Sequence, residues 1–248
     1  MFDHTVPLYI DQQPFSVYYM TVSGHSAYSP TNAMTQKNYH MVEDLPISET
    51  MKCYISCSLD LELAMQSLIR QLEEAGIADE TVVVITTDHY PYGLAKSDTW
   101  GGQGNYLAEL YGTDQINDHV RDSNSLIIWS GCLEDMDIVV DDPVSVLDIL
   151  PTLSNLFGVD FDSRLMVGRD VFSDTDPLVF WPLTYSWKTD KGSYDGKTGI
   201  FTPSEGVAVE EGYEDKIHTD IRNRMVYCRA VQQNDYFNVI SDLMGFEK

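Results

Sequence analysis

The chain has 248 residues, of which 43% are hydrophobic and 22% charged, values typical of a folded protein with a sizeable core. Its formal net charge of −24 at pH 7 repels phosphate backbones, which excludes nucleic acids as expected partners. Anionic substrates are repelled as well, unless a cation reverses the field at the site. No stretch approaches the roughly 20 apolar residues of a membrane-spanning helix, and the start lacks signal-peptide features, so we expect a soluble chain.

The first half of the chain predicts two strands separated by one long helix. Residues 14–22 (PFSVYYMTV) are rich in β-branched and aromatic side chains, which is typical of a strand. From residue 51 to 74, apolar residues recur at spacings of three and four, which predicts a helix, and Gly76 is placed to end it. Residues 81–87 (TVVVITT) form an apolar run that predicts a buried strand.

Farther along, the pattern predicts a strand at 125–131, a helix at 141–150, short strands at 178–181 and 199–201, and a long C-terminal helix at about 215–244. The helix at 141–150 opens with an N-cap and a proline at its first position; Pro151 should bend or restart it, and Gly158 should stop it. The glycine-rich segment 96–104 (KSDTWGGQG) is either a lid beside a site or an ordinary surface loop.

The order of these elements indicates the fold class. Near-continuous apolar strands that alternate with helices predict an α/β domain, with a mostly parallel sheet covered by helices on both faces. We expect this domain to occupy residues 1–175. Residues 176–248 would form a smaller C-terminal α+β part with short strands and a long terminal helix.

Asp88 and His89 place a carboxylate beside an imidazole where a predicted strand leaves the core. Ligands of open α/β sheets bind outside the carboxyl ends of the strands, and His25 follows the other strand. An aspartate oxygen and an imidazole nitrogen suit Zn²⁺ or Mn²⁺ better than Ca²⁺. A shared ion needs a turn, which Pro91 and Gly93 favour. Taken alone, the pair is more often a helix cap and a surface histidine, so both interpretations stay open.

Four segments of the chain occur in an order that can be compared with known families. They are FSVYYMTVSGH (15–25), YISCSLDLELA (54–64), VVVITTDHY (82–90), and DILPTLSNLFG (148–158) with GRDVFS (168–173). In this order they resemble the C-terminal half of the catalytic domain in the sulfatase-like, alkaline-phosphatase superfamily, and most closely the lipoteichoic acid synthase branch. The resemblance covers residues 14–173, about two-thirds of the chain.

The resemblance implies a sulfatase-like fold and metal-dependent transfer of phosphoryl or sulfuryl groups. It assigns Asp88 and His89 to a divalent metal, Mn²⁺ in this branch, with Zn²⁺, Mg²⁺ or Ca²⁺ as alternatives. It assigns His25 to the phosphate or glycerol oxygens of the substrate. That substrate would be a phosphate or sulfate ester, including glycerol-phosphate polymers of the cell envelope. The parent protein would be held at the outer face of a bacterial membrane, and only by upstream spanning helices.

Several family features have no counterpart in this sequence. Only 24 residues precede His25, and none matches the upstream nucleophile, the first acidic metal ligand, or the tryptophan and arginine that contact phosphate. YSPT (28–31) lacks the arginine of the sulfatase nucleophile motif, and PYGL (91–94) replaces a serine that follows the Asp-His turn in the synthase branch. We therefore expect the C-terminal part of a larger enzyme, with no nucleophile identified in this chain and little or no turnover by it alone.

Two other interpretations remain. A non-catalytic module that keeps the fold for binding or assembly is favoured by the missing nucleophile and disfavoured by the retained Asp88, His89 and His25. A self-contained metallohydrolase with Ser29 or Thr31 as nucleophile is the least favoured, because both residues lie in an irregular stretch with no evident base beside them.

Overall fold

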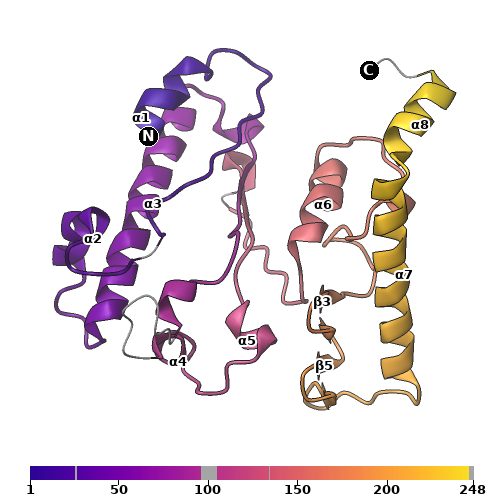
Figure 1. The fold of residues 1–248 in the computed structure, drawn as a ribbon. Helices are drawn as coiled ribbons and strands as arrows, with labels where there is room; N and C mark the ends of the chain where they lie inside the picture. The colour runs from indigo at the N-terminus through magenta and orange to yellow at the C-terminus, as the bar shows by residue number, and fades with distance from the viewer. Residues whose placement is uncertain (26, 96–104, 134, 246–248) are drawn as a thin grey trace. The chain divides into compact units, whose positions relative to one another are not determined.

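The computed structural model describes residues 1–25, 27–95, 105–133 and 135–245 (Figure 1). The chain divides into two compact units, Met1–Ile138 and Val139–Lys248. Hydrophobic clusters lie within each unit, two in the first and one in the second. Each unit is therefore described by itself.

The described part of the first unit is mainly helical. Its helices are α1 (Phe2–Thr5), α2 (Ala33–Asn38), α3 (Glu49–Glu74), α4 (Tyr106–Tyr111) and α5 (Asp118–Arg121). Its strands are β1 (Val83–Ile85) and β2 (Ile127–Trp129), and short 3₁₀ turns occur at Val6–Leu8, Tyr39–Met41, Ala78–Glu80, Tyr92–Leu94 and Gly131–Leu133.

The helix predicted at 51–74 is confirmed as α3, the long helix of this unit in Figure 1. Its N-terminus is capped by the Ser48 hydroxyl, which accepts a backbone N–H of the first turn. Gly76 follows the helix with φ of +71°, the left-handed conformation that glycine adopts without strain. The buried side chains of Leu68 and Leu72 pack with Phe2, which fixes α1 against α3.

The prediction of a mostly parallel sheet with helices on both faces is wrong for the described residues. β1 and β2 are antiparallel, with Val83 opposite Trp129 and Ile85 opposite Ile127. A parallel pair needs a crossover connection that covers the sheet, usually a helix of a dozen or more residues. Between β1 and β2 the described chain offers only the short helices α4 and α5, and α4 packs into another cluster with Met51.

The predicted strand at 14–22 is also wrong. Residues 15–22 form no strand, and their side chains are largely solvent-exposed, with Tyr18 at 85% and Met20 at 72%. A strand needs a neighbour that pairs its backbone N–H and C=O groups, and the described residues supply none here. Phe15 and Tyr19 are half-buried exceptions: the Phe15 ring packs edge-on against Tyr9 at 5.0 Å, and the Tyr19 ring against Phe2 at 4.7 Å.

The second unit combines an antiparallel sheet with helices. Its helices are α6 (Ile149–Leu156), α7 (Tyr213–Gln233) and α8 (Tyr236–Met244), with 3₁₀ turns at Val146–Asp148 and Ser163–Leu165. Its four strands are β3 (Val179–Trp181), β4 (Ser186–Thr189), β5 (Gly192–Asp195) and β6 (Ile200–Pro203), which pair in sequence order. Figure 1 shows this meander beside α7, and the fully buried Trp187 joins them by packing with Tyr213 and Ile221.

The C-terminal helix predicted at 215–244 is interrupted. Asp235 adopts the left-handed conformation, with φ of +48°, and separates α7 from α8. Asp and Asn visit this conformation more readily than other side chains, and Asn234 precedes it. None of the helices in the described ranges is both long enough and apolar enough to cross a bilayer.

The helix predicted at 141–150 begins later than expected. Ser145 and Asp148 form a capping box, so a 3₁₀ turn leads into α6 at Ile149. Pro151 lies in the first turn of α6, where a missing N–H removes no helical hydrogen bond. Gly158 lies beyond the end of the helix with φ of +62°, as predicted.

Asp148 ties the start of α6 to the segment 168–173. This carboxylate is 4% exposed and accepts the backbone N–H of Arg169 on Oδ1 and that of Ser145 on Oδ2, both at 2.8 Å. Gly168 approaches so closely that an added Cβ would lie 2.0 Å from the carbonyl oxygen of Leu147. A side chain at position 168 would therefore force the two segments apart.

Two more side chains of α6 hold the same segment. The Thr152 hydroxyl donates to the Asp148 carbonyl at 2.6 Å and accepts the backbone N–H of Val171 at 3.1 Å. The Asn155 amide donates to the Asp170 carboxylate at 2.6 Å. These hydrogen bonds hold together the segments 148–158 and 168–173. The residue types of both segments are therefore explained by their structural role and need no catalytic role.

Candidate metal and substrate site

Asp88 and His89 form a bend after β1. The Asn124 amide, just before β2, donates to the Thr87 hydroxyl, which holds the bend beside the start of β2. The 3₁₀ turn that follows inserts Leu94, at 0% exposure, into the cluster around α3. The bend is therefore fixed on both sides, while its own side chains face solvent.

The two side chains of the bend face one another. His89 Nδ1 lies 2.8 Å from the carbonyl oxygen of Tyr90. A carbonyl can only accept, so Nδ1–H donates, and Nε2 is the unprotonated nitrogen of the neutral ring. Nε2 lies 3.4 Å from Oδ2 of Asp88. The arrangement presents one nitrogen lone pair and one carboxylate oxygen on the same side of the chain.

This donor set fits a divalent transition metal ion. Two ligands each about 2.1 Å from a metal, at a tetrahedral angle, lie about 3.4 Å apart. The spacing between His89 Nε2 and Asp88 Oδ2 is 3.4 Å. Their side chains are 44% and 78% exposed, so an ion could reach them without displacing the core. The carbonyl of Tyr90 orients the imidazole as partners of metal-binding histidines commonly do.

Tyr92 brings His25 to the same surface. Its hydroxyl shares a hydrogen bond of 3.0 Å with Nε2 of His25, and its ring centroid lies 4.9 Å from that of His89. The rings of His25 and Tyr92 meet edge-on at 6.0 Å. The two histidines thus both contact one tyrosine, although they are 64 positions apart in the sequence.

The turn that carries His25 is supported from α3. The Tyr28 hydroxyl donates to the Gly24 carbonyl at 3.0 Å, and its ring packs edge-on against Tyr54 at 5.1 Å. Burial raises the pKa of both tyrosines well above the ordinary value. The Tyr28 hydroxyl remains protonated at neutral pH and continues to donate to Gly24, which keeps the turn in place.

The described residues do not form a complete metal shell. Across the described ranges, no group of three or more His, Cys, Asp or Glu side chains is placed to hold one ion. The Ser29 hydroxyl hydrogen-bonds Thr31 at 3.1 Å and makes no hydrogen bond to an imidazole or carboxylate of the described chain, so no base activates it. The proposed lid at 96–104 lies outside the described residues.

Sequence reasoning missed Tyr92. The segment PYGL was treated only as a turn and as a departure from the family pattern, yet its tyrosine contacts both histidines. A signal was available, because an aromatic residue three positions after a histidine returns to it when the chain turns. Tyr90 was missed as well. The Arg121 guanidinium lies over its ring, 4.9 Å from the ring centroid, in a cation–π contact.

The comparisons with known proteins agree with the resemblance drawn from the four segments. The sequence model of the family described as Sulfatase matches residues 1–159. The lipoteichoic acid synthase of Staphylococcus saprophyticus is 25% identical over 174 residues, which cover 68% of this chain and 25% of that protein. The lipoteichoic acid synthase of Staphylococcus aureus (strain USA300) is 24% identical over 162 residues, covering 65% of this chain and 23% of that protein.

These matches confirm the resemblance as distant homology and set its extent. The chain spans about a quarter of the length of the curated relatives it matches. The family match includes His25, Asp88 and His89, together with the whole first unit.

Proposed function

The chain belongs to the sulfatase family, and from this premise we propose that it forms part of a metal-dependent enzyme that transfers or hydrolyses phosphate or sulfate esters. Asp88 and His89 would hold the divalent metal, Mn²⁺ in the first place, with Zn²⁺, Mg²⁺ or Ca²⁺ as alternatives. His25 would contact the substrate. Residues 1–175 would belong to the catalytic domain and residues 176–248 to a C-terminal subdomain.

One observation supports this proposal above the others. His89 Nε2 and Asp88 Oδ2 lie 3.4 Å apart, and the hydrogen bond between Nδ1 of His89 and the Tyr90 carbonyl fixes the ring with Nε2 beside Asp88. This spacing is compatible with two ligands of one metal ion, which supports the proposal.

In this proposal, each residue of the site has a separate role toward an ester substrate. A bound divalent cation supplies Lewis-acid stabilisation of charge on the ester oxygens and offsets the field of a chain with net charge −24. His25 binds an ester or alcohol oxygen by a hydrogen bond. Tyr92 orients the His25 ring through its hydroxyl and, with its ring beside His89, keeps the two histidines at a fixed separation.

The substrate class follows from the relatives. The two relatives described above are lipoteichoic acid synthases, which supports a phosphate ester, including glycerol-phosphate polymers of the cell envelope. The parent protein would then act at the outer face of a bacterial membrane. Any membrane contact would come from polypeptide beyond these 248 residues.

The same account predicts that this chain does little chemistry alone. A shell of two protein ligands binds a metal weakly, and the described residues include no activated nucleophile. We propose that the remaining metal ligands and the nucleophile come from further polypeptide of the same enzyme. The short span relative to the relatives supports this division.

A non-catalytic module for binding or assembly is the second candidate. The incomplete metal shell within the described ranges favours it. The facing Asp88 and His89 donors and the Tyr92 contact with His25 speak for the enzyme, because a module without chemistry has no need of either.

Turnover measurements separate these candidates. A chromogenic phosphodiester and a chromogenic sulfate ester are offered with Mn²⁺ to the 248-residue chain and to a version extended by the upstream region of a full-length relative. We expect no turnover by the 248-residue chain and measurable turnover by the extended protein. His89→Ala in the extended protein should abolish that turnover. Turnover by the chain alone would show that it carries its own nucleophile. If the extended protein folds but shows no turnover, the non-catalytic module is favoured.

A further inference from the structure

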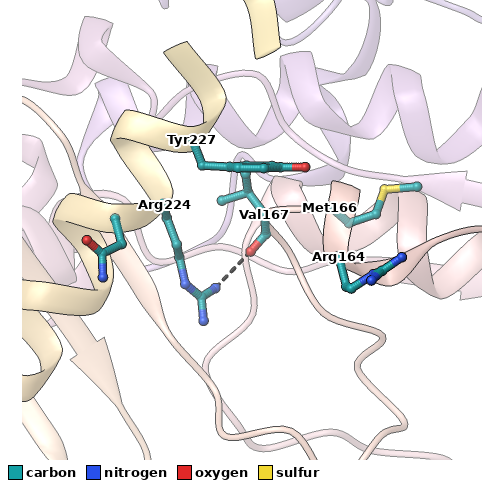
Figure 2. Close-up of a pocket in the computed structure, with 6 residues that line it drawn as sticks. Arg164, Met166, Val167, Arg224 and Tyr227 are labelled. Carbon is teal, nitrogen blue, oxygen red and sulfur yellow. Dashed lines mark hydrogen bonds between the residues drawn. The ribbon is translucent and has the colours of Figure 1, made fainter. Parts of the chain in front are cut away.

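The second unit contains a pocket of about 230 Å³ that the proposed chemistry does not use. Figure 2 shows it between the segment that follows the turn Ser163–Leu165 and one face of α7. Its lining residues are Arg164, Met166, Val167, Asn223, Arg224 and Tyr227. The chain has 39 acidic and 15 basic residues, yet two arginines and no carboxylate line this pocket.

Arg224 is held in place by its own neighbours. Its Nη1 donates to the Val167 carbonyl at 2.7 Å, the dashed line in Figure 2, and its Nε and Nη2 pair with Asp220 at 3.1 and 3.0 Å. A guanidinium has five N–H groups, so one N–H on each terminal nitrogen remains. The side chain is 27% exposed, which limits its freedom to move away.

Arg164 lines the pocket from the opposite segment; its side chain points away from Arg224 in Figure 2 and, at 87% exposure, is free to rotate toward it. Its Nε and Nη2 bind Asp162, with Nη2 at 2.6 Å from Oδ2, and its Nη1 makes no hydrogen bond to the described residues. The Asn223 amide and the Tyr227 hydroxyl likewise make none within the described chain. The pocket is thus rich in uncommitted donors.

The remaining wall is apolar. Met166, Val167 and the flat face of the Tyr227 ring line it, and Figure 2 shows the tyrosine ring extending over Val167. A group that is both an acceptor and partly apolar would satisfy the donors and cover this wall at once. A metal cation would meet two guanidinium groups and is not accommodated.

We propose that this pocket binds a small organic oxyanion, an acceptor-only phosphate, sulfate or carboxylate head group joined to a short apolar body. The head group receives N–H groups of Arg164 and Arg224, and the body lies against Val167 and Tyr227. Because Asp162 and Asp220 already balance the two guanidinium charges, binding depends on directed hydrogen bonds more than on net charge. The affinity is accordingly modest and survives moderate salt.

Three probes test the two parts of this ligand. Phenyl phosphate carries both parts, inorganic phosphate only the head group, and phenol only the body. Amide chemical shifts of the 248-residue chain are followed with each probe in the presence of a chelator, so that no metal contributes. We expect phenyl phosphate to shift residues 164–167 and 223–227 at the lowest concentration, and phenol to leave them unchanged.

Variants assign the binding to the two arginines. Arg164→Gln and Arg224→Gln should each weaken phenyl phosphate binding about tenfold, the loss expected for one charge-assisted hydrogen bond. Arg222→Gln removes the same charge from an exposed position of α7 outside the pocket and should change nothing. Arg164 has an 87% exposed side chain, so its variant stays folded even if Arg224→Gln does not.

Three results would overturn the proposal. The first is that about 20 mM phenyl phosphate shifts no amide of the pocket. The second is that Arg164→Gln binds phenyl phosphate as tightly as Arg222→Gln and the wild type do. The third is that phenol binds as tightly as phenyl phosphate. None of these depends on metal or turnover, so the ester chemistry assigned to Asp88 and His89 can fail or hold independently.

Discussion

The hydroxyl group of Tyr92 lies 3.0 Å from Nε2 of His25, in a contact that joins residues 67 positions apart. The same tyrosine ring lies 4.9 Å from the ring of His89. Tyr92 therefore couples the histidine that we assign to substrate to the bend that we assign to metal.

Tyr92→Phe removes this hydrogen bond and keeps the ring. We expect the ¹⁵N resonance of His25 Nε2 to move, and the free energy of unfolding of the first unit to fall by about 1 kcal/mol, the usual net value of one hydrogen bond. Tyr18→Phe is the matched control, because Tyr18 is 85% exposed and makes no hydrogen bond within the described chain. An unchanged His25 resonance would show that the contact does not form in solution.

Asp148→Ala should destabilise the second unit by about 2–4 kcal/mol, because it leaves two N–H groups without acceptors, the buried one of Arg169 and the partly buried one of Ser145. Asp148→Asn keeps one acceptor oxygen and should cost clearly less. Denaturant unfolding followed by fluorescence measures both. Equal loss in the two variants would mean that charge, rather than acceptor number, holds the α6 segment.

Trp187→Ala should cost about 3–5 kcal/mol, the range for removing a buried aromatic side chain. Trp187 is 0% exposed and packs against Tyr194, Phe201 and Tyr213, so the meander would lose its contact with α7. Leu183→Ala, at a 96% exposed position, should change stability by less than about 0.5 kcal/mol. Similar losses at both positions would contradict this core.

The Asp162 carboxylate should titrate at unusually low pH. Side-chain hydrogen bonds from Arg164, and then its backbone N–H, lower the pKa of Asp162 from 3.8 to about 2. Because the folded pKa is depressed, any stabilisation is present above pH 3.8 and disappears as pH falls through about 2. ¹³C NMR of the carboxyl carbon checks this, and Arg164→Gln should return the midpoint towards 3.8. A normal midpoint in the wild type would mean that the pair is broken in solution.

Local elements of the fold could be predicted from local signals. The spacing of Leu68 and Leu72 and the position of Gly76 predict α3 to within a few residues. The end of α7 was harder to predict from the sequence. Asn234 and Asp235 are compatible with a continuous helix and also with the left-handed conformation that ends α7. The preferences of these two residues do not decide between the two conformations.

Sheet topology could not be predicted from the same signals. The apolar run at 81–87 correctly indicates a strand, since β1 lies within it, but nothing in the run specifies its partner or direction. Direction depends on whether the connecting chain can cover the sheet, and the described part of the connection to β2 does not. The run at 14–22 has similar composition, yet no described strand lies beside it to complete a ladder.

The residues of the candidate site could be named from the sequence, but their geometry could not. The Asp-His dipeptide indicates two donor types, and the structure adds that they face each other and that Tyr90 selects the tautomer of His89. The role of Tyr92 depends on a turn that brings it back to His25, which no local pattern reports.

Paramagnetic line broadening by Mn²⁺ tests the central claim most directly. A substoichiometric amount of Mn²⁺ is added to the ¹⁵N-labelled chain, and the broadened amides are mapped for wild type, His89→Gln, and His40→Gln at an exposed control histidine. The account predicts the strongest broadening around Asp88 and His89, lost in His89→Gln and retained in His40→Gln. Broadening spread over other acidic surfaces of this chain and unchanged by His89→Gln would contradict it.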